Sequence, residues 1–200
     1  MSELETLAVE IARCTQCLLH RGRTKAVPGE GPADAEIMFI GEAPGFHEDQ
    51  QGRPFVGAAG RFLEELLASI GLTREEVYIT NVIKCRPPSN REPLPDEIEA
   101  CKSFLNQQIE LIQPKLVVTL GRFSMARAFP KARISRIHGR PRKVGGVLYY
   151  PMYHPAAALH QPSLRRTVEE DMRRIPELLQ QAAQIAESPL LPEAEQLRLF

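Results

Sequence analysis

The chain has 200 residues, of which 43% are hydrophobic and 25% are charged, and this composition is ordinary for one globular domain with a real hydrophobic core. It contains no run of about 18 apolar residues, and the segment 1–10 is acidic and amphipathic, so we expect neither a membrane span nor a secretory signal. These features predict a cytoplasmic protein that does not bind membranes, and 17 prolines with an excess of arginine over lysine favour a thermophilic source.

The charges are unevenly distributed, although the net charge is zero. Residues 111–168 contain eleven lysines and arginines and no aspartate or glutamate. Such a segment needs an anionic partner, of which a nucleic-acid backbone is the most common, or an acidic surface elsewhere in the fold. We favour a nucleic acid, with pairing to distant helices as the alternative.

The predicted elements alternate between helices and short apolar strands, which is typical of a mostly parallel sheet with helices on both faces. In chain order they are a helix at 3–13, a strand at 36–40, a helix at 58–70, a strand at 77–83, a helix from 95 that ends before Pro114, a strand at 116–120, a helix at 122–129, a strand at 147–150 and a helix at 163–186. The segments 46–57, 131–143 and 156–166 are expected to be loops. We therefore predict an α/β fold with a central four-stranded parallel sheet, organised as a single domain at 1–187 with a loosely held tail at 188–200.

The turn Gly41–Gly45 follows a buried apolar run, and the rest of the chain is organised around it. Its two glycines permit close backbone approaches, although an ordinary turn that happens to hold Glu42 is the alternative. Ligands bind at the carboxyl ends of parallel strands. We therefore expect this turn to meet the segment 81–85, Gly121 and His154 at one edge of the sheet.

Four cysteines could form one metal site, because two of them are separated by only two residues. They are Cys14, Cys17, Cys85 and Cys101. The spacing matches no standard zinc finger and does not distinguish zinc from an iron-sulfur cluster, and the missing secretion signal argues against a disulfide framework. The alternative is that Cys101 occupies a helix stripe while the Cys14 and Cys17 pair is redox-active or incidental.

Three polar or aromatic residues near the predicted strand ends are candidates for recognition of a nucleic-acid base. Asn81 lies in a β-branched strand, where asparagine is disfavoured, and its planar amide could read the edge of a base or simply cap a turn. Phe55 could stack on a base or anchor the core. His154 could donate a hydrogen bond to a developing anion, or it could be structural.

Five motifs occur together in the order and approximate spacing of family 4 uracil-DNA glycosylases, which the chain resembles over residues from about 4 to 180. They are Gly41-Glu42-Ala43-Pro44-Gly45, Gly52-Arg53-Pro54-Phe55-Val56-Gly57, Thr80-Asn81, Lys84-Cys85-Arg86-Pro87-Pro88 and Tyr153-His154-Pro155-Ala156. The resemblance implies the three-layer uracil-DNA-glycosylase fold and a [4Fe-4S] cluster on the four cysteines. It also implies that the cluster is structural and fixes loops that meet DNA.

The resemblance and the chemistry of base excision together assign the residues that bind uracil. An enzyme that acts on one base must extrude the nucleotide into a pocket and bind both its face and its edge. Phe55 would stack on the flipped uracil and Asn81 would contact its O4 and N3 edge. Backbone groups of Gly41, Glu42 and Ala43 would add polar contacts.

Two residues are assigned to catalysis. Hydrolysis of an N-glycosidic bond passes through an oxocarbenium-like sugar, so the protein must stabilise a uracil anion and position water. His154 would donate a hydrogen bond to uracil O2, and Glu42 would act on the water or on the sugar cation. Family 1 enzymes carry aspartate where this chain has Ala43, and Glu42 is the nearest plausible carboxylate.

The basic segment is then expected to grip phosphates on both sides of the flipped nucleotide, while Leu159 or His160 wedges into the vacated stack. The predicted DNA-binding residues are Arg133, Arg136, His138, Arg140, Arg142, Lys143, Leu159 and Arg165. The expected partner is uracil-containing DNA, single- or double-stranded, and we expect the protein to be a monomer.

We therefore predict a monofunctional glycosylase of base excision repair that hydrolyses the N-glycosidic bond of deoxyuridine, releases uracil and leaves an abasic site. Three alternatives stay open. They are a relative specific for another deaminated base such as hypoxanthine, a non-catalytic nucleic-acid-binding module stabilised by a metal, and an iron-sulfur electron carrier. An electron carrier would leave the acid-free basic segment unexplained.

Overall fold

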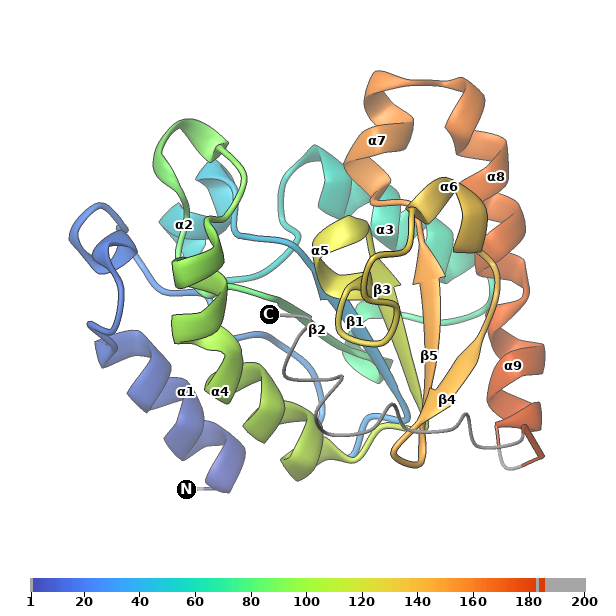
Figure 1. Ribbon diagram of the computed structural model, residues 1–200, viewed down its shortest axis with the longest axis horizontal. Coiled ribbons are helices and arrows are strands. Elements are labelled where there is room, and N and C mark those ends of the chain that lie inside the picture. The colour runs from blue at the N-terminus through green and yellow to red at the C-terminus, as the bar shows by residue number, and fades with distance from the viewer. Residues whose placement is uncertain (1, 183, 186–200) are drawn as a thin grey trace.

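The chain forms three layers in the part that the structure describes, with a central sheet between two layers of helices (Figure 1). The structure is a computed structural model that describes residues 2–182 and 184–185. The strands are β1 (Ile37–Gly41), β2 (Tyr78–Asn81), β3 (Leu116–Leu120), β4 (Arg142–Val144) and β5 (Val147–Met152). The predicted α/β class is confirmed, while the predicted tail at 188–200 lies outside the described residues.

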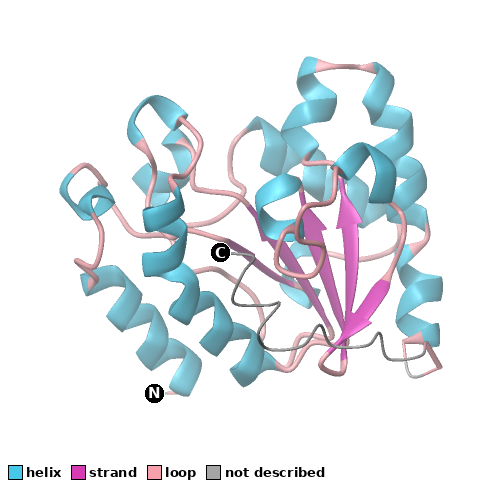
Figure 2. Cartoon of the chain, viewed as in Figure 1, coloured by secondary structure: helices cyan, strands magenta, loops and turns pink. Residues whose placement is uncertain are grey.

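The sheet has the strand order β2-β1-β3-β5-β4, and its strands in the described chain number five rather than the four predicted. Four of them are parallel, and β4 pairs antiparallel with β5 at the edge (Figure 2). Gly145 and Gly146 join these two strands with φ angles of 58° and 80°. Two consecutive left-handed residues suit a two-residue hairpin, so the chain folds back directly. The Gly-Gly pair was the sequence signal for this hairpin. Because β4 begins at Arg142, the prediction of one loop over 131–143 was wrong at its end.

The helices agree with the predictions where the apolar periodicity is long, and differ where local signals dominate. They are α1 (Glu3–Arg13), α2 (Phe46–Gln51), α3 (Ala58–Ser69), α4 (Pro95–Ile112), α5 (Arg122–Met125), α6 (Ile134–Ile137), α7 (Pro155–His160), α8 (Ser163–Arg173) and α9 (Ile175–Gln181), with 3-10 turns at Leu18–Arg21, Arg74–Glu76 and Pro88–Asn90. The helix predicted at 163–186 is two helices, because Pro176 lies in the first turn of α9 and cannot continue the hydrogen bonding of α8. The loops predicted at 46–57 and 156–166 contain α2 and α7.

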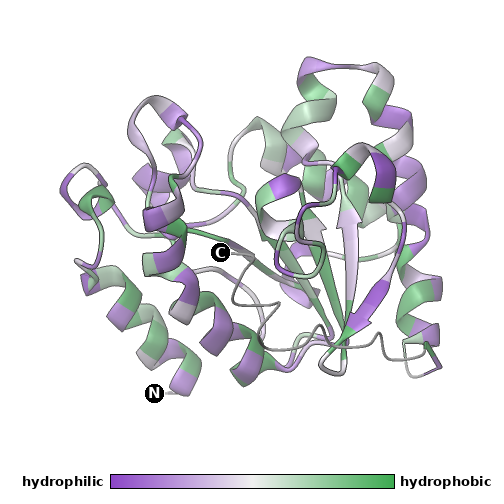
Figure 3. Cartoon of the chain, viewed as in Figure 1, coloured by the Kyte–Doolittle hydropathy of each residue, from purple (hydrophilic) through white to green (hydrophobic). Residues whose placement is uncertain are grey.

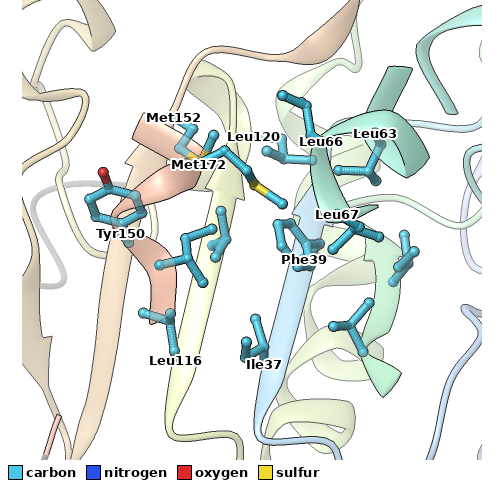
Figure 4. Packing of buried hydrophobic residues seen from close by; sticks show 14 of the residues in the cluster. Ile37, Phe39, Leu63, Leu66, Leu67, Leu116, Leu120, Tyr150, Met152 and Met172 are labelled. Carbon is cyan, nitrogen blue, oxygen red and sulfur yellow. The ribbon is translucent and has the colours of Figure 1, made fainter. Parts of the chain in front are cut away.

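Side chains that alternate along β1 divide the core into two halves. Ile37 and Phe39 face α3, α8 and α9, and Figure 4 shows Phe39 packed beside Leu67 in this half. Met38 and Ile40 face the opposite half, which α1 and α4 cover. Figure 3 shows hydrophobic strands in the interior and mixed hydropathy along the outer helices. Because both faces are covered, ligands can reach the sheet only at its edges.

No helix in the described part of the chain is both long and apolar enough to cross a membrane.

Candidate active site

The carboxyl ends of the parallel strands meet at one edge of the sheet, the upper edge in Figure 1. Gly41 at the end of β1 pairs in register with Asn81 at the end of β2. Gly121 follows β3 and its N–H donates to the carbonyl of Met152 at the end of β5, two residues before His154. The topology therefore brings together the strand-end residues that the sequence analysis selected.

Gly41 is the point on which the two candidate base-contacting side chains converge. A Cβ atom on Gly41 would lie 2.4 Å from Asn81 Oδ1 and 2.6 Å from Phe55 Cζ. Within the described residues, the side-chain amide of Asn81 makes no hydrogen bond, although only 2% of the residue is exposed. Asn81 thus presents a nearly buried amide, with donor and acceptor free, directly beside an aromatic ring.

Phe55 belongs both to the core and to the site, so the two roles considered for it are compatible. It is 5% exposed and packs in the core half that contains Phe39. Its ring also stacks with that of His154, with centroids 5.5 Å apart and an angle of 24° between the planes. The residue has a φ of 50°, a left-handed conformation that is uncommon for a bulky residue.

Arg74 holds Phe55 in this strained conformation, and Glu30 in turn holds Arg74. The sequence analysis missed both residues. The guanidinium of buried Arg74 donates to the carbonyl oxygens of Phe55, at 2.8 Å, and of Pro54. Arg74 is held in turn by Glu30, whose pKa is lowered to about 2, chiefly by its hydrogen bond from Arg53. Because Arg74 lies 19 residues from Phe55 in the chain, no local sequence signal connects them.

Gly60 in α3 is required by the same loop. A Cβ atom at Gly60 would lie 1.8 Å from the Phe55 carbonyl oxygen. We expect Gly60→Ala to lower the free energy of unfolding by about 1–3 kcal/mol, the usual cost of overpacking, and to lower enzymatic turnover because Phe55 must shift. Thermal unfolding and turnover measure the two effects. Gly22→Ala is the control, since Gly22 has a φ of −105° and a Cβ atom there would meet nothing within 4 Å, and an equal loss in both variants would contradict this account.

His154 is a neutral hydrogen-bond donor in this environment. It is the N-cap of α7, and its Nδ1 accepts a hydrogen bond from the Ala156 N–H at 3.1 Å, so the proton of the neutral ring is on Nε2. Burial lowers the pKa of His154 to about 4, with the charge of Glu48 acting in the opposite direction. A Cβ on Gly121 would lie 3.3 Å from the Cβ of His154, a tight contact, and the φ of 91° at Gly121 disfavours any side chain there.

The protonation of His154 can be checked directly. Since the pKa is about 4, we expect the NMR signals of its ring to stay those of the neutral Nε2–H tautomer from pH 7 to about pH 5. Because the unfolded histidine has the higher pKa, protons bind preferentially to the unfolded chain below about pH 6.5, and stability falls as the pH is lowered from there towards 4. The His154→Gln variant assigns the signal, and a midpoint near 6.5 would refute the lowered pKa.

Glu42 lies in the turn that follows β1 and is half-buried, and burial raises its pKa. Glu92 raises this pKa further, whereas Arg122 opposes the shift. Arg122 and Glu92 form an ion pair with each other, so the start of α5 meets the loop that contains Glu92, and the charges of both residues act on Glu42. Arg122 directly follows Gly121 and could have been selected from the sequence, whereas Glu92 has no such signal. Ala43, next to Glu42, packs against the core half on the α1 and α4 side.

The four cysteines gather at a separate pocket, which Lys84 also lines. Cys14, Cys17, Cys85 and Cys101 are free thiols and line one pocket between α1 and α4. Within the described chain, no three Cys, His, Asp or Glu side chains already form a site for a metal ion. The chemistry of the donors nevertheless suits a metal group, because the guanidinium of Arg23 donates to Cys85 Sγ at 3.2 Å and would stabilise an anionic thiolate.

The predicted DNA-binding residues fall into two groups. The side chains of Arg133, Arg136 and Arg140 are exposed and have no hydrogen bond or ion pair within the described chain, and Leu159 is 43% exposed at the end of α7. The others have protein partners. Arg142 donates to the Ala128 carbonyl, Lys143 to the Ala182 carbonyl, Arg165 pairs with Glu65 and Glu169, and His138 Nδ1 lies 2.8 Å from Asp171 Oδ2. Internal pairing therefore accounts for part of the acid-free segment, while binding of an external anion by the three exposed arginines stays a prediction.

Comparison with known proteins agrees with this geometry. The family model described as Uracil DNA glycosylase superfamily matches residues 28–180. The chain is 50% identical to the type-4 uracil-DNA glycosylase of Sulfurisphaera tokodaii, over 89% of this chain and 86% of the relative. It is 49% identical to the type-4 enzyme of Archaeoglobus fulgidus, over 89% and 94%, and 30% identical to the type-5 enzyme of Pyrobaculum aerophilum, over 88% of each. The chain therefore belongs to the uracil-DNA glycosylase superfamily, in its type-4 branch.

Proposed function

We propose that the chain hydrolyses the N-glycosidic bond of deoxyuridine in DNA, releases uracil and leaves an abasic site for base excision repair. One observation carries the proposal. The Asn81 amide and the Phe55 ring converge on Gly41, the residue with no side chain at the end of β1, and the imidazole of His154 stacks with the Phe55 ring. This arrangement supplies a surface for the face of a base, groups for its edge and a donor for its leaving charge.

Binding begins with extrusion of the nucleotide, because the target bond is inaccessible within a base stack. Uracil then stacks on Phe55, and Asn81 accepts from N3–H and donates to O4. Cytosine presents the opposite pattern at these two positions, so an amide held in one orientation rejects it. Backbone groups of Gly41, Glu42 and Ala43 complete the contacts.

The bond between C1′ and N1 breaks with its electron pair passing to the base. Neutral His154 donates its Nε2–H to O2 of the resulting uracil anion and stabilises it without transferring a full charge, which is electrostatic catalysis of the oxyanion-hole kind. The sugar becomes oxocarbenium-like, and the carboxylate of Glu42 orients the water that attacks C1′ and accepts its proton. The water oxygen remains on the sugar as the hydroxyl of the abasic site, and the proton taken up by Glu42 returns through solvent to the uracil anion, which leaves as neutral uracil and restores the carboxylate.

Phosphates on either side of the extruded nucleotide are bound by Arg133, Arg136 and Arg140, with Leu159 or His160 entering the vacated stack. The exposure of these arginines supports the assignment. Arg142, Lys143, Arg165 and His138 would have to exchange protein partners for phosphate, and we expect them to contribute less. We place the enzyme in the cytoplasm. We also propose that it is a monomer, and size-exclusion chromatography tests this oligomeric state.

We also propose that Cys14, Cys17, Cys85 and Cys101 hold a [4Fe-4S] cluster. When bound, the cluster links the segment after α1 to the loop after β2 and to α4, and it stabilises them without taking part in hydrolysis. Analysis of iron, sulfide and zinc, together with the visible absorbance of the purified protein, tests this assignment. One zinc ion per chain with no sulfide would contradict it.

The function is tested by incubating the enzyme with oligonucleotides that contain a single deoxyuridine or a single deoxyinosine. Alkaline cleavage at the abasic site and mass spectrometry of the released base report the reaction. We expect cleavage only at deoxyuridine. Cleavage at deoxyinosine would indicate a glycosylase for another deaminated base, and binding without cleavage of either would indicate a non-catalytic module.

A further inference from the structure

Two loops carry residues that we propose to bind the base, and a single carboxylate contacts both loops. One loop is the turn Gly41–Gly45, and the other is the segment 52–57, which carries Phe55. Oε1 of Glu48 accepts hydrogen bonds from the N–H groups of Val56 and Gly57, both at 2.8 Å. Its Oε2 accepts from the N–H of Gly45 at 3.1 Å. Glu48 therefore connects the last residue of one loop to the two residues that follow Phe55 in the other.

The three N–H groups are the unsatisfied donors that occur at the starts of helices. Gly45 is the N-cap of α2, and the carboxylate of Glu48 in its first turn accepts from the Gly45 N–H, which is the glutamate half of a capping box. Gly57 is the N-cap of α3, and no side chain of its own can satisfy the donors there. One carboxylate thus caps two helices and sets the position of the short connection between them. A negative charge at two helix N-termini is favourable on electrostatic grounds as well.

The neighbouring carboxylate has no such role. Asp49 is 2% exposed, its Oδ1 accepts from the N–H of Thr24 at 2.9 Å and its Oδ2 from Gln50 Nε2 at 3.4 Å, and neither partner belongs to the two loops. Glu48 and Asp49 are therefore adjacent carboxylates with similar chemistry, of which only one contacts the loops of the pocket. The charge of Glu48 also reaches His154, since it acts against the lowering of that residue's pKa.

We propose that Glu48 is a positioning residue for uracil excision, whose carboxylate holds the ring of Phe55 over Gly41 so that the stacking surface is formed before the base enters. A preformed site loses less conformational entropy on binding and keeps its groups where the transition state needs them. Glu48 does not act on the substrate itself, because its oxygens are occupied by three backbone donors. This inference rests on the proposed function.

The test compares Glu48→Gln with the matched variant Asp49→Asn. Glutamine retains one acceptor oxygen but turns an NH₂ group towards a backbone N–H. Three charge-assisted hydrogen bonds are then weakened, and we expect kcat/KM for uracil release to fall about 10- to 100-fold. The inhibition constant of free uracil should rise as well, because a displaced Phe55 ring binds the base less tightly. Asp49→Asn is expected to lower the unfolding temperature but to keep kcat/KM within about threefold of the wild-type value.

A double-mutant cycle with Phe55→Ala separates positioning from general stabilisation. If Glu48 acts through Phe55, Glu48→Gln should change kcat/KM less than about threefold once the ring is absent. Should Glu48→Gln not fold, Glu48→Asp is used in its place, because aspartate can still cap α2 but is too short to reach Val56 and Gly57.

Three results would overturn the proposal: near-normal activity of the Glu48 variants, an equal loss in Asp49→Asn, or an undiminished effect of Glu48→Gln in the Phe55→Ala background. The wild-type enzyme is measured in the same series. A wild-type protein that releases no uracil would refute the proposed function instead, so the two failures are distinguishable.

Discussion

Replacing His154 by alanine is expected to lower the single-turnover rate of uracil release by about 10²- to 10³-fold, the usual cost of removing one donor to a developing oxyanion. The imidazole is fixed on one side by the Ala156 N–H, which leaves Nε2–H as the only donor that the neutral ring can offer to the base. Its pKa of about 4 means that the ring is neutral at pH 7, so the loss reflects a missing hydrogen bond rather than a missing positive charge.

Single-turnover kinetics on a deoxyuridine oligonucleotide measures this effect, since product release does not limit the rate. The affinity for DNA should change little, because in the proposed mechanism the ring contacts the base and not the phosphates. His154→Gln is the useful companion, since its amide can restore part of the hydrogen bond at a similar distance. A rate within about threefold of wild type in His154→Ala would remove the residue from the mechanism.

Replacing Asn81 by alanine is expected to abolish most uracil excision while leaving the metal site intact. The amide is 2% exposed and has no partner within the described chain, so base contacts are the interactions that its removal would eliminate. A bidentate contact to a base edge contributes about 1–3 kcal/mol, which corresponds to a loss of roughly 5- to 160-fold, and any misplacement of the base adds to it.

The cluster provides the control for Asn81→Ala. Asn81 lies at the end of β2, and its backbone carbonyl accepts from Lys84 Nζ at 2.8 Å, next to the ligand Cys85 that we propose. The substitution keeps that carbonyl, so iron content and visible absorbance should match those of the wild-type protein. Near-normal turnover of Asn81→Ala would eliminate the base-reading role, and loss of iron with activity would attribute the defect to the metal site.

The fold was predictable wherever one strong pattern extended over a whole element. The apolar stripe of α1 and the buried run of β1 gave those elements within one residue, and the parallel topology then placed Gly41, Asn81, Gly121 and His154 at one edge. Short elements were less predictable, because a turn such as Gly145-Gly146 or a cap such as Glu48 depends on two or three residues.

The supporting residues of the site were beyond sequence reasoning for a physical reason. Arg74 and Glu48 act on backbone carbonyl and N–H groups, which nearly every residue has, so their partners leave no trace in the sequence. The basic segment shows the same limit. Arg165 is neutralised by Glu65 from 100 residues earlier, whereas Arg136 stays exposed, and only the folded chain distinguishes them.

The central claim is that one pocket around Gly41 reads and releases uracil, and the structure of the enzyme with free uracil tests it most directly. We predict the ring stacked on Phe55, with O4 and N3 at the Asn81 amide and O2 at Nε2 of His154. Uracil bound with O2 towards Asn81, or bound outside this pocket by an enzyme that excises it, would contradict the account.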